Sequence, residues 1–321
     1  MFEMTPKMGE FADVEPLSIS TGLPDELCEI MYTDEYRELL GIARSLMARG
    51  ELSERALRLT GRVIDLAPAF YTIWNYRFDI LVSLSKDLSN DEKVLRLNEE
   101  LDWIDEFTLN NPKNYQIWSY KQCILQNHPS PVLKRELPIL KFMLDEDTKN
   151  YHVWSFRKWC ILFFNDFSNE LEFADSMVER DVYNNSAWTH RMFILKNLKP
   201  TAVEIKTEVE YIMRKINYVP QNISPWTYLR GIYENFLASK YDNNIVEFAK
   251  KFTSNVTDLD FEDPNVKLPD IESSYSLEFL AHIYSLQKTT IINAKRAYMG
   301  LSSKYDPIRK FYWDSQISRL H

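Results

Sequence analysis

The side chains in this sequence best suited to chemistry occur in two short segments, residues 113–116 and 149–152. Both read Lys-Asn-Tyr followed by a polar residue, which is Gln116 in the first segment and His152 in the second. The Asn is expected to cap a helix, so the Lys stands where backbone N–H groups are free and the helix dipole is positive. That arrangement suits a bound anion, and ordinary capping beside a solvated Lys is the alternative.

Sequence motifs for other kinds of chemistry are missing. No HExxH, CxxC or His-rich cluster supplies a set of metal ligands, and no Ser has a hydrolase motif around it. The seven Gly are scattered and none has GxG spacing, which excludes the usual nucleotide-binding loops. Acidic groups such as Glu99-Glu100 and residues 145–147 are predicted to be solvated helix ends. The remaining histidines are predicted to be packed or exposed without a role: His128, His190, His282 and His321.

The composition points to a folded, acidic protein. The 321 residues carry a net charge of −9, which argues against general affinity for nucleic acid or anionic membranes. No apolar run is long enough to cross a bilayer, and the first twenty residues have no apolar core of a secretory signal. The three cysteines, Cys28, Cys123 and Cys160, are far apart, which favours reduced thiols and a cytoplasmic location.

An internal repeat supplies the elements that must position the two segments. Five similar blocks, each with a central Trp, follow one another along the chain, and a weaker sixth copy occurs near its end. The repeated Trp is interpreted as core packing, and the Arg or Lys three residues later as a structural partner of a neighbouring helix or carbonyl. The blocks are centred near Trp74, Trp118, Trp154, Trp188, Trp226 and, for the weak copy, Trp313.

Each repeat is predicted to be a hairpin of two amphipathic helices. Between two of the Trp blocks, for example, Ile205, Ile212 and Ile216 recur with helical spacing. A single hairpin cannot bury its apolar stripe alone, so the repeats should stack into an all-α solenoid, a crescent-shaped superhelix, with equivalent turns on one edge. We expect an acidic tail over residues 1–24, a single solenoid domain over 25–321, and a surface loop over 258–270.

The repeated pattern Asn-Tyr-x-x-Trp-x-x-Arg resembles the repeats of the protein prenyltransferase α subunit. The residues that carry the resemblance lie at 112–118, 149–154 and 184–188, and it is closest to the α subunit shared by protein farnesyltransferase and geranylgeranyltransferase type I. The resemblance implies a crescent of helical hairpins around a β subunit that holds the catalytic zinc. It also implies transfer of a farnesyl or geranylgeranyl group from its diphosphate to the Cys of a C-terminal CaaX sequence.

The resemblance also assigns roles to individual residues. Lys113 matches a lysine that contacts the prenyl diphosphate, and His152 lies near the same group, so these two are the catalytic candidates. Gln116 matches a glutamine that binds the peptide's terminal carboxylate, and Tyr71 lies near the peptide's last residue. The rest of the active-site rim consists of Tyr115, Asn150 and Tyr151. One departure from the pattern is Phe70, which stands where the other repeats have their capping Asn.

The same resemblance implies partners and alternatives. The implied partners are the β subunit, a prenyl diphosphate and CaaX-terminated proteins such as Ras- and Rho-type small GTPases, with Mg²⁺ possible in the farnesyl reaction. A Rab-type geranylgeranyltransferase α subunit is a second reading, disfavoured because the sequence has no leucine-rich extension after its last repeat. A TPR-like scaffold that binds peptides without catalysis is the third.

Overall fold

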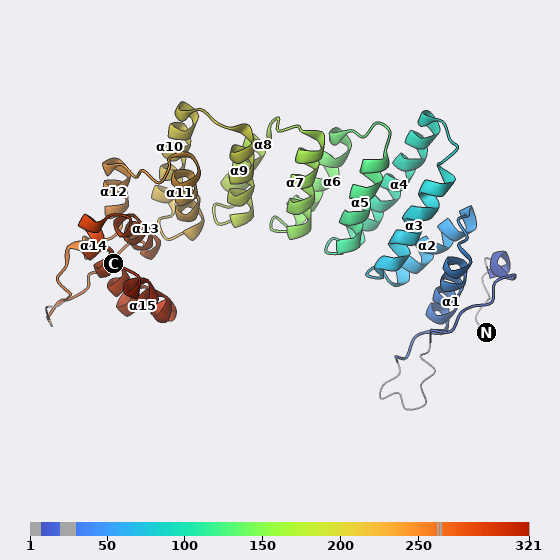
Figure 1. Cartoon of the computed structure of the whole chain (residues 1–321), viewed down its shortest axis with the longest axis horizontal. Coiled ribbons are helices and arrows are strands. Elements are labelled where there is room, and N and C mark those ends of the chain that lie inside the picture. The colour runs from blue at the N-terminus through green and yellow to red at the C-terminus, as the bar shows by residue number, and fades with distance from the viewer. Residues whose placement is uncertain (1–7, 20–29, 262, 264, 321) are drawn as a thin grey trace. The chain divides into compact units, whose positions relative to one another are not determined.

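The computed structural model describes residues 8–19, 30–261, 263 and 265–320, and these residues form helices and connecting segments without a strand (Figure 1). The chain divides into two compact units, Met1–Asn165 and Asp166–His321. Both consist of α-helices that pair with their neighbours in the sequence. The predicted all-α class and the α-solenoid of stacked hairpins are confirmed.

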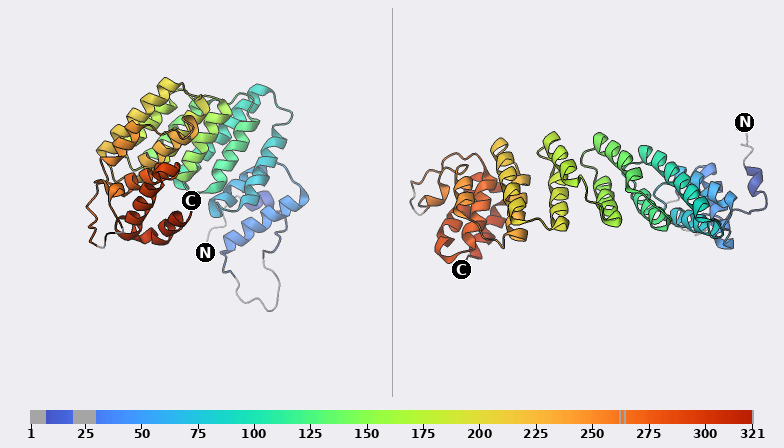
Figure 2. Two further views of the ribbon diagram at one scale, coloured as in Figure 1. Left: turned by 60° about the vertical axis from the view of Figure 1, so that its left-hand side comes forward. Right: turned by 90° about the horizontal axis from the view of Figure 1, so that it is seen from above.

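The first unit contains three helical hairpins, preceded by a short 3-10 turn and one further helix. In each hairpin the two helices pack against each other, and the second helices also contact one another in order, α3 with α5 and α5 with α7. Figure 2 shows α4 beside α5 from two further sides. The elements are η1 (Met8–Phe11), α1 (Asp34–Arg49), α2 (Glu54–Leu66), α3 (Tyr71–Leu84), α4 (Asn90–Asn110), α5 (Tyr115–Asn127), α6 (Leu133–Glu146) and α7 (Tyr151–Phe164).

The second unit continues with two hairpins and ends in shorter, less regular elements. Helix α8 packs on α9 and α10 on α11, followed by contacts of α13 with α12 and α14. The described residues between η2 and α13 are not helical, in agreement with the predicted loop over 258–270. The elements are α8 (Glu170–Arg180), α9 (Asn185–Leu198), α10 (Ala202–Tyr218), α11 (Ile223–Phe236), α12 (Asn243–Lys250), η2 (Val256–Asp258), α13 (Ser274–Ser285), η3 (Lys288–Thr290), α14 (Ile291–Gly300), η4 (Leu301–Tyr305), η5 (Pro307–Arg309) and α15 (Lys310–Ser318).

Helix α10 illustrates how the local sequence makes these elements. The Thr201 hydroxyl accepts a hydrogen bond from the Glu204 amide, and the Glu204 carboxylate in turn accepts one from the Thr201 amide. This capping box supplies partners for groups that the first turn of a helix leaves unpaired. From there the helix buries Ile205, Ile212 and Ile216, which are at most 3% exposed. The amphipathic helix expected from their spacing is therefore present.

The repeated Trp residues form the core between neighbouring helices, as predicted. All five are at most 5% exposed. In four of them the indole Nε1 donates a 2.9 Å hydrogen bond to the backbone carbonyl six residues earlier, in the turn that precedes the helix. The exception is Trp118, whose buried Nε1 has no partner among the described residues. The Trp thus packs the core and also fixes the turn that starts its own helix.

The cation three residues after the Trp pairs with a buried carboxylate of the next hairpin. The Arg77 guanidinium donates two hydrogen bonds to Glu100, at 2.6 and 2.8 Å, and the Tyr120 hydroxyl donates a third at 2.7 Å. Glu100 is 5% exposed, so its prediction as a solvated helix end was wrong. Such a buried charge is tolerated because it is paired and fully hydrogen-bonded.

The equivalent cations in two of the following repeats also pair with carboxylates. Arg191 and Glu208 make the same two bonds at 2.6 and 2.7 Å. Lys121, which is 0% exposed, lies 2.7 Å from Glu136 and also pairs with Asp105. A lysine offers one point charge instead of a planar fork, and here two carboxylates surround it. The structural role predicted for these cations is confirmed.

Residues 8–19, within the predicted N-terminal tail, pack along α1 and α2. Phe11 and Val14 are buried, and Asp13 accepts hydrogen bonds from Arg55 at 2.7 and 3.0 Å. The Leu17 amide donates to the Gly41 carbonyl at 3.1 Å, and a Cβ on Gly41 would come within 2.9 Å of the Leu17 oxygen. Gly41 therefore permits the close approach of this acidic segment to α1.

Candidate functional site

The two segments singled out in the sequence form the turns that open α5 and α7. The Asn114 side-chain oxygen accepts a hydrogen bond from the Ile117 amide at 3.2 Å. The Asn150 oxygen likewise accepts from the His152 amide at 3.0 Å. Both residues therefore cap their helices, as predicted. At α3 the capping position is Phe70, which makes no side-chain cap, as its residue type indicated.

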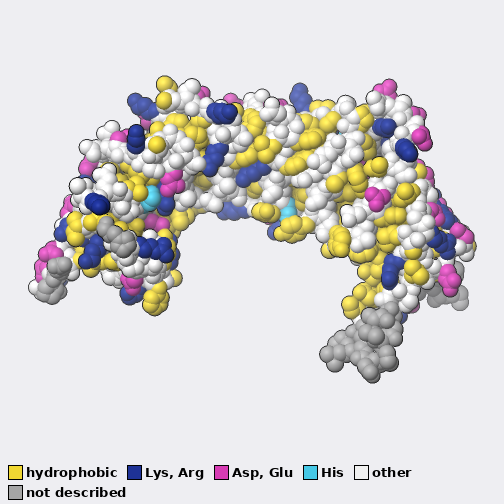
Figure 3. Space-filling view, in the orientation of Figure 1, with side chains coloured by type: hydrophobic (Ala, Val, Ile, Leu, Met, Phe, Trp, Pro, Cys, Tyr) yellow, Lys and Arg dark blue, Asp and Glu magenta, His cyan; other side chains and the backbone are white. Residues whose placement is uncertain are grey.

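A tyrosine occupies the first position of each of the three second helices in the first unit. Tyr71, Tyr115 and Tyr151 are 66%, 66% and 68% exposed. In Figure 3, hydrophobic side chains and a histidine gather at the lower ends of α5 and α7. Large aromatic side chains that stay exposed at equivalent positions contribute little to this unit's own core, and they present both a ring and a hydroxyl to a ligand.

His152 lies between the tyrosines of its own turn and the preceding one. Its ring centroid is 4.2 Å from that of Tyr115 and 5.5 Å from that of Tyr151, each in an edge-to-face arrangement. Burial against these rings lowers the pKa of His152 below its ordinary value of 6.5. The lowered pKa favours the neutral imidazole at pH 7, which can donate one hydrogen bond and accept another.

Lys113 is 75% exposed, and its Nζ lies 3.4 Å from the Asp147 carboxylate in the turn before α7. Asp147 was predicted to be a solvated helix end, and it remains 42% exposed, but it also faces the cation of the neighbouring turn. Because this ion pair is so open to water, it contributes little to stability. A more highly charged anion can therefore replace the Asp147 carboxylate beside Lys113. The turns before α5 and α7 thus meet through this ion pair as well as through His152.

Gln116 and Tyr71 complete the predicted set. Gln116 is half-buried at the second position of α5, and its amide has no hydrogen-bond partner within the described part of the chain. Tyr71 belongs to the turn before α3, one repeat earlier. The structure therefore brings Lys113, Tyr115, Tyr151 and His152 together at the turns before α5 and α7, while Gln116 is the second residue of α5 and Tyr71 is the first of α3.

The capping asparagines make a second bond that their sequence pattern did not reveal. Asn114 Nδ2 donates to the Pro68 carbonyl at 2.7 Å, and Asn150 Nδ2 donates to the Pro112 carbonyl at 3.1 Å. Each acceptor belongs to the turn of the preceding repeat. Asn150 is 3% exposed, so its side chain is part of the frame under the rim. The recurrence of Asn at the capping position of four repeats, 114, 150, 184 and 222, was the available signal, since a cap requires only a side-chain oxygen.

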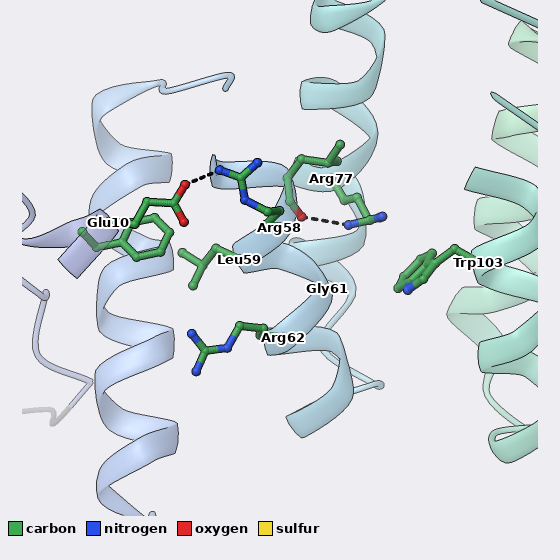
Figure 4. A pocket seen from close by; sticks show the side chains of 9 residues that line it. Glu10, Arg58, Leu59, Gly61, Arg62, Arg77 and Trp103 are labelled. Carbon is green, nitrogen blue, oxygen red and sulfur yellow. Dashed lines mark hydrogen bonds and ion pairs between the residues drawn. The ribbon is translucent and has the colours of Figure 1, made fainter. Parts of the chain in front are cut away.

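Two cavities of the first unit lie elsewhere. One, of about 440 Å³, lies between the N-terminal segment and α2, with Arg58, Arg62 and Trp103 in its lining, as Figure 4 shows. The other, of about 510 Å³, is lined by residues of α4, the end of α5 and the start of α6. None of the seven predicted site residues lines either cavity. Lys113 and the tyrosines of the candidate site lie at the surface, since each is at least 66% exposed.

The other histidines and the cysteines have packing environments. His190 is buried with its Nε2 2.8 Å from Glu170, His128 is buried, and His282 is partly buried near Glu234. Cys123 is half-buried and Cys160 is buried, and neither forms a disulfide within the described part of the chain. His321 and Cys28 lie outside the described residues.

Two properties of the described residues bear on what this chain can bind. No group of three or more His, Cys, Asp or Glu side chains in this part of the chain is arranged to hold a metal ion. Within the same residues, no helix combines the length and apolar character needed to cross a bilayer. What the candidate site does offer is one lysine, exposed phenol groups, a neutral imidazole and an unpaired amide. These groups can bind and polarise an anion or a carboxylate, but they include no activated nucleophile.

Comparisons with known proteins agree on one family. The family described as "Protein prenyltransferase alpha subunit repeat" matches five segments of the chain, residues 53–84, 97–128, 133–164, 167–198 and 205–236. These segments coincide with the five hairpins from α2 to α11. They end before the weak sixth copy near Trp313, which stays a prediction.

Whole-chain relatives carry the same description. A protein farnesyltransferase/geranylgeranyltransferase type-1 subunit alpha from Candida albicans is 41% identical, over 99% of both chains. Its counterpart from Dictyostelium discoideum is 31% identical, over 98% of this chain and 93% of that protein. A solved structure, Candida albicans protein geranylgeranyltransferase-I complexed with GGPP, superposes with a TM-score of 0.81 at 39% identity, covering 96% of this chain and 98% of that one.

Proposed function

Because the chain belongs to the protein prenyltransferase α-subunit family, of the type shared by farnesyltransferase and geranylgeranyltransferase type I, we propose that it works as half of a heterodimeric enzyme. In this proposal the heterodimer transfers a farnesyl or geranylgeranyl group from its diphosphate to the Cys of a C-terminal CaaX sequence. The observation that carries it for this chain is the meeting of the turns before α5 and α7, where Lys113, Tyr115, Tyr151 and His152 form one rim.

The diphosphate is proposed to bind at this rim, with Lys113 and His152 as the catalytic residues. As the bond from the prenyl carbon to the diphosphate breaks, negative charge grows on the departing oxygens, and the Lys113 ammonium offsets it. Lys113 binds the diphosphate before this step by giving up its ion pair with the exposed carboxylate of Asp147. The neutral His152 ring and the phenol groups of Tyr115 and Tyr151 donate hydrogen bonds without adding charge.

The CaaX peptide is proposed to end on the side of the rim toward α3. The Gln116 amide, which has no partner of its own among the described residues, is suited to bond the terminal carboxylate through its N–H₂ group. Tyr71, two-thirds exposed at the start of α3, is available to contact the last side chain of the peptide. The two substrates would thus occupy adjacent turns of consecutive repeats.

The metals of the reaction are proposed to lie outside this chain. The described residues contain no set of ligands for one, and we infer that the β subunit holds the zinc, with Mg²⁺ taking part in the farnesyl reaction. Zinc lowers the pKa of a thiol that coordinates it, so the substrate Cys, held there as a thiolate, would be the nucleophile that this chain lacks. The contribution of the present chain is to bind and orient the two anionic groups.

The wider setting follows from the same proposal. The protein substrates would be CaaX-terminated proteins such as Ras- and Rho-type small GTPases, and the enzyme would act in the cytoplasm. Residues 25–321 would serve as a single solenoid domain behind the acidic tail over residues 1–24.

Co-expression with candidate β chains tests the proposal directly. The chain should co-purify with a farnesyltransferase or geranylgeranyltransferase type I β subunit, and the complex should prenylate a CaaX peptide in a zinc-dependent way. Supplying both diphosphates shows which one each complex consumes. Activity only on Rab proteins with a type II β chain would establish the Rab-type alternative. A stable monomer that binds peptides and pairs with no β chain would establish the scaffold alternative.

A further inference from the structure

The capping asparagines of the site connect one repeat to the next. Each uses its side-chain oxygen for the helix that it starts and its Nδ2 for a carbonyl in the preceding turn. The carboxamide is short and both its ends are occupied, so it sets the distance between the two turns. Asn114 joins the turn of Tyr71 to that of Gln116, and Asn150 joins the turn of Lys113 to that of His152.

The acceptor carbonyls differ in how firmly they are held. Pro68 O accepts hydrogen bonds from Asn114 and from the indole of Trp74, which belongs to the same turn's helix. Pro112 O accepts from Asn150, while the indole of Trp118 has no partner in the described part of the chain. The turn that carries Lys113 therefore lacks the Trp bond that the other repeats have, and it depends more on Asn150.

We propose that Asn114 and Asn150 are positioning residues for the two substrates, an inference that rests on the proposed function. Neither acts by touching a ligand, since Asn150 is 3% exposed and both carboxamides are already bonded at each end. Asn114 fixes the turn of Tyr71 relative to the turn of Gln116 and so serves the peptide. Asn150 fixes the turn of Lys113 relative to the turn of His152 and so serves the diphosphate.

The chain contains a matched control in its second unit. Asn222 caps α11 by accepting from the Ser224 amide at 3.0 Å, and its Nδ2 donates to the Val182 carbonyl at 2.9 Å. That carbonyl also accepts from the Trp188 indole, as Pro68 O does from Trp74. The hydrogen bonds are the same, but no predicted site residue lies on either turn that Asn222 joins.

The test replaces each asparagine by serine in the heterodimer with its active β chain. Serine keeps a capping oxygen but is too short to reach the preceding turn. Asn114→Ser should raise the KM for the CaaX peptide by about tenfold with little change in kcat, and Asn150→Ser should lower kcat by about tenfold, as expected for a small displacement of a binding group. Asn222→Ser should lower the melting temperature about as much as Asn114→Ser, with both kinetic constants unchanged.

The contrast between the three variants decides the matter. Equal kinetic constants for Asn114→Ser and Asn222→Ser, or the same loss of activity in all three variants, would show that the asparagines serve only the fold. Either result would overturn the inference, while an active wild-type complex would still support the proposed function. A wild-type complex without transferase activity would instead refute the proposed function, and the inference with it. If a serine variant does not assemble, Asn→Asp at the same three positions keeps the capping oxygen, removes the Nδ2 donor, and should give the same split.

Discussion

The turns before α5 and α7 in the first unit and those before α9 and α11 in the second are built on the same plan. In both, an Asn caps the helix and a buried Trp donates to the turn's carbonyl, with Trp118 as the exception. The exposed positions around the Asn differ. In the first unit they hold Lys and Tyr, followed by a half-buried Gln or His, whereas in the second they hold Tyr183, Asn185, Gln221 and Ile223. The capping Asn and the buried Trp serve the fold, and the residue types beside the Asn can therefore differ and serve binding.

Gln221 shows what happens to such a position when it is used for packing. It stands one residue before the capping Asn222, where Lys113 and Lys149 stand in the first unit. Its carboxamide exchanges two hydrogen bonds, both 2.9 Å, with Ser274 at the start of α13. Lys113 instead makes one exposed ion pair with Asp147. The second unit uses the position to join elements, and the first leaves its side chain available to a ligand.

The largest expected effect is a loss of unfolding free energy when a buried arginine–glutamate pair is broken, and it should be similar in the two units. Glu100→Ala and Glu208→Ala each leave a buried arginine without its carboxylate, which typically costs about 3–5 kcal/mol of unfolding free energy. Denaturant unfolding of the heterodimer measures the loss. Glu210→Ala, on the exposed face of α10, is the control and should change little. A loss below about 1 kcal/mol in both variants would contradict the view that these pairs hold the repeats together.

The next effect should separate the units. Lys113→Ala should slow prenyl transfer by about 100-fold or more, comparable to the loss of one oxyanion donor, about 2.7–4 kcal/mol, because it removes the cation that faces the leaving diphosphate. Steady-state and single-turnover rates of the heterodimer measure it, and assembly with the β chain should be unchanged. Gln221→Ala, at the equivalent position of the second unit, should keep the wild-type rate. Wild-type kcat in Lys113→Ala would refute the assignment of this lysine.

A smaller effect should separate the two halves of the rim. Gln116→Ala should weaken binding of the CaaX peptide by about tenfold, the scale of one hydrogen bond to a charged carboxylate, because the peptide then loses its amide partner. Affinity for the prenyl diphosphate should stay the same. Fluorescence titration of each substrate with the heterodimer gives both constants, and equal losses for the two substrates would count against a role in peptide binding.

The smallest effect concerns the charge of His152. Its pKa lies below 6.5 because of burial, so the unfolded chain takes up this proton first as the pH falls. The contribution of His152 to stability is therefore complete above pH 6.5 and is lost as the pH falls from 6.5 through the folded pKa. NMR titration of heterodimer with labelled histidine, assigned with His152→Gln, should give a midpoint below 6.5. A midpoint at or above 6.5 would mean that the ring is a cation at the rim.

Most of the architecture could be predicted because it repeats. The spacing of Ile205, Ile212 and Ile216 predicted their helix, and the recurrent Trp predicted the core, since in each repeat the same residue meets the same neighbours. The caps at Asn114 and Asn150 followed from local rules that involve only a few consecutive residues. The roles of the seven site residues came from the resemblance to a family and remain predictions to be tested by the variants above.

Glu100 marks where such prediction stopped. Next to Glu99 in an amphipathic helix it has the pattern of a solvated residue, yet it accepts hydrogen bonds from Arg77 and Tyr120 on two different helices. Asp147 is similar, since its partner Lys113 lies on another turn. Neither pairing is visible in a sequence window, because it depends on which helices meet.

The sequence by itself determined the repeat, the helices, the caps and the residue types at the rim, because each of these depends on contacts between residues close in the chain or on a pattern that recurs. Tertiary structure alone decided that Asn114 and Asn150 reach back to the preceding turns, that Lys113 faces Asp147, and that residues 8–19 pack along α1 and α2. These features join groups from different repeats or distant segments. Their distances are set by how the hairpins stack, which only the packed core establishes.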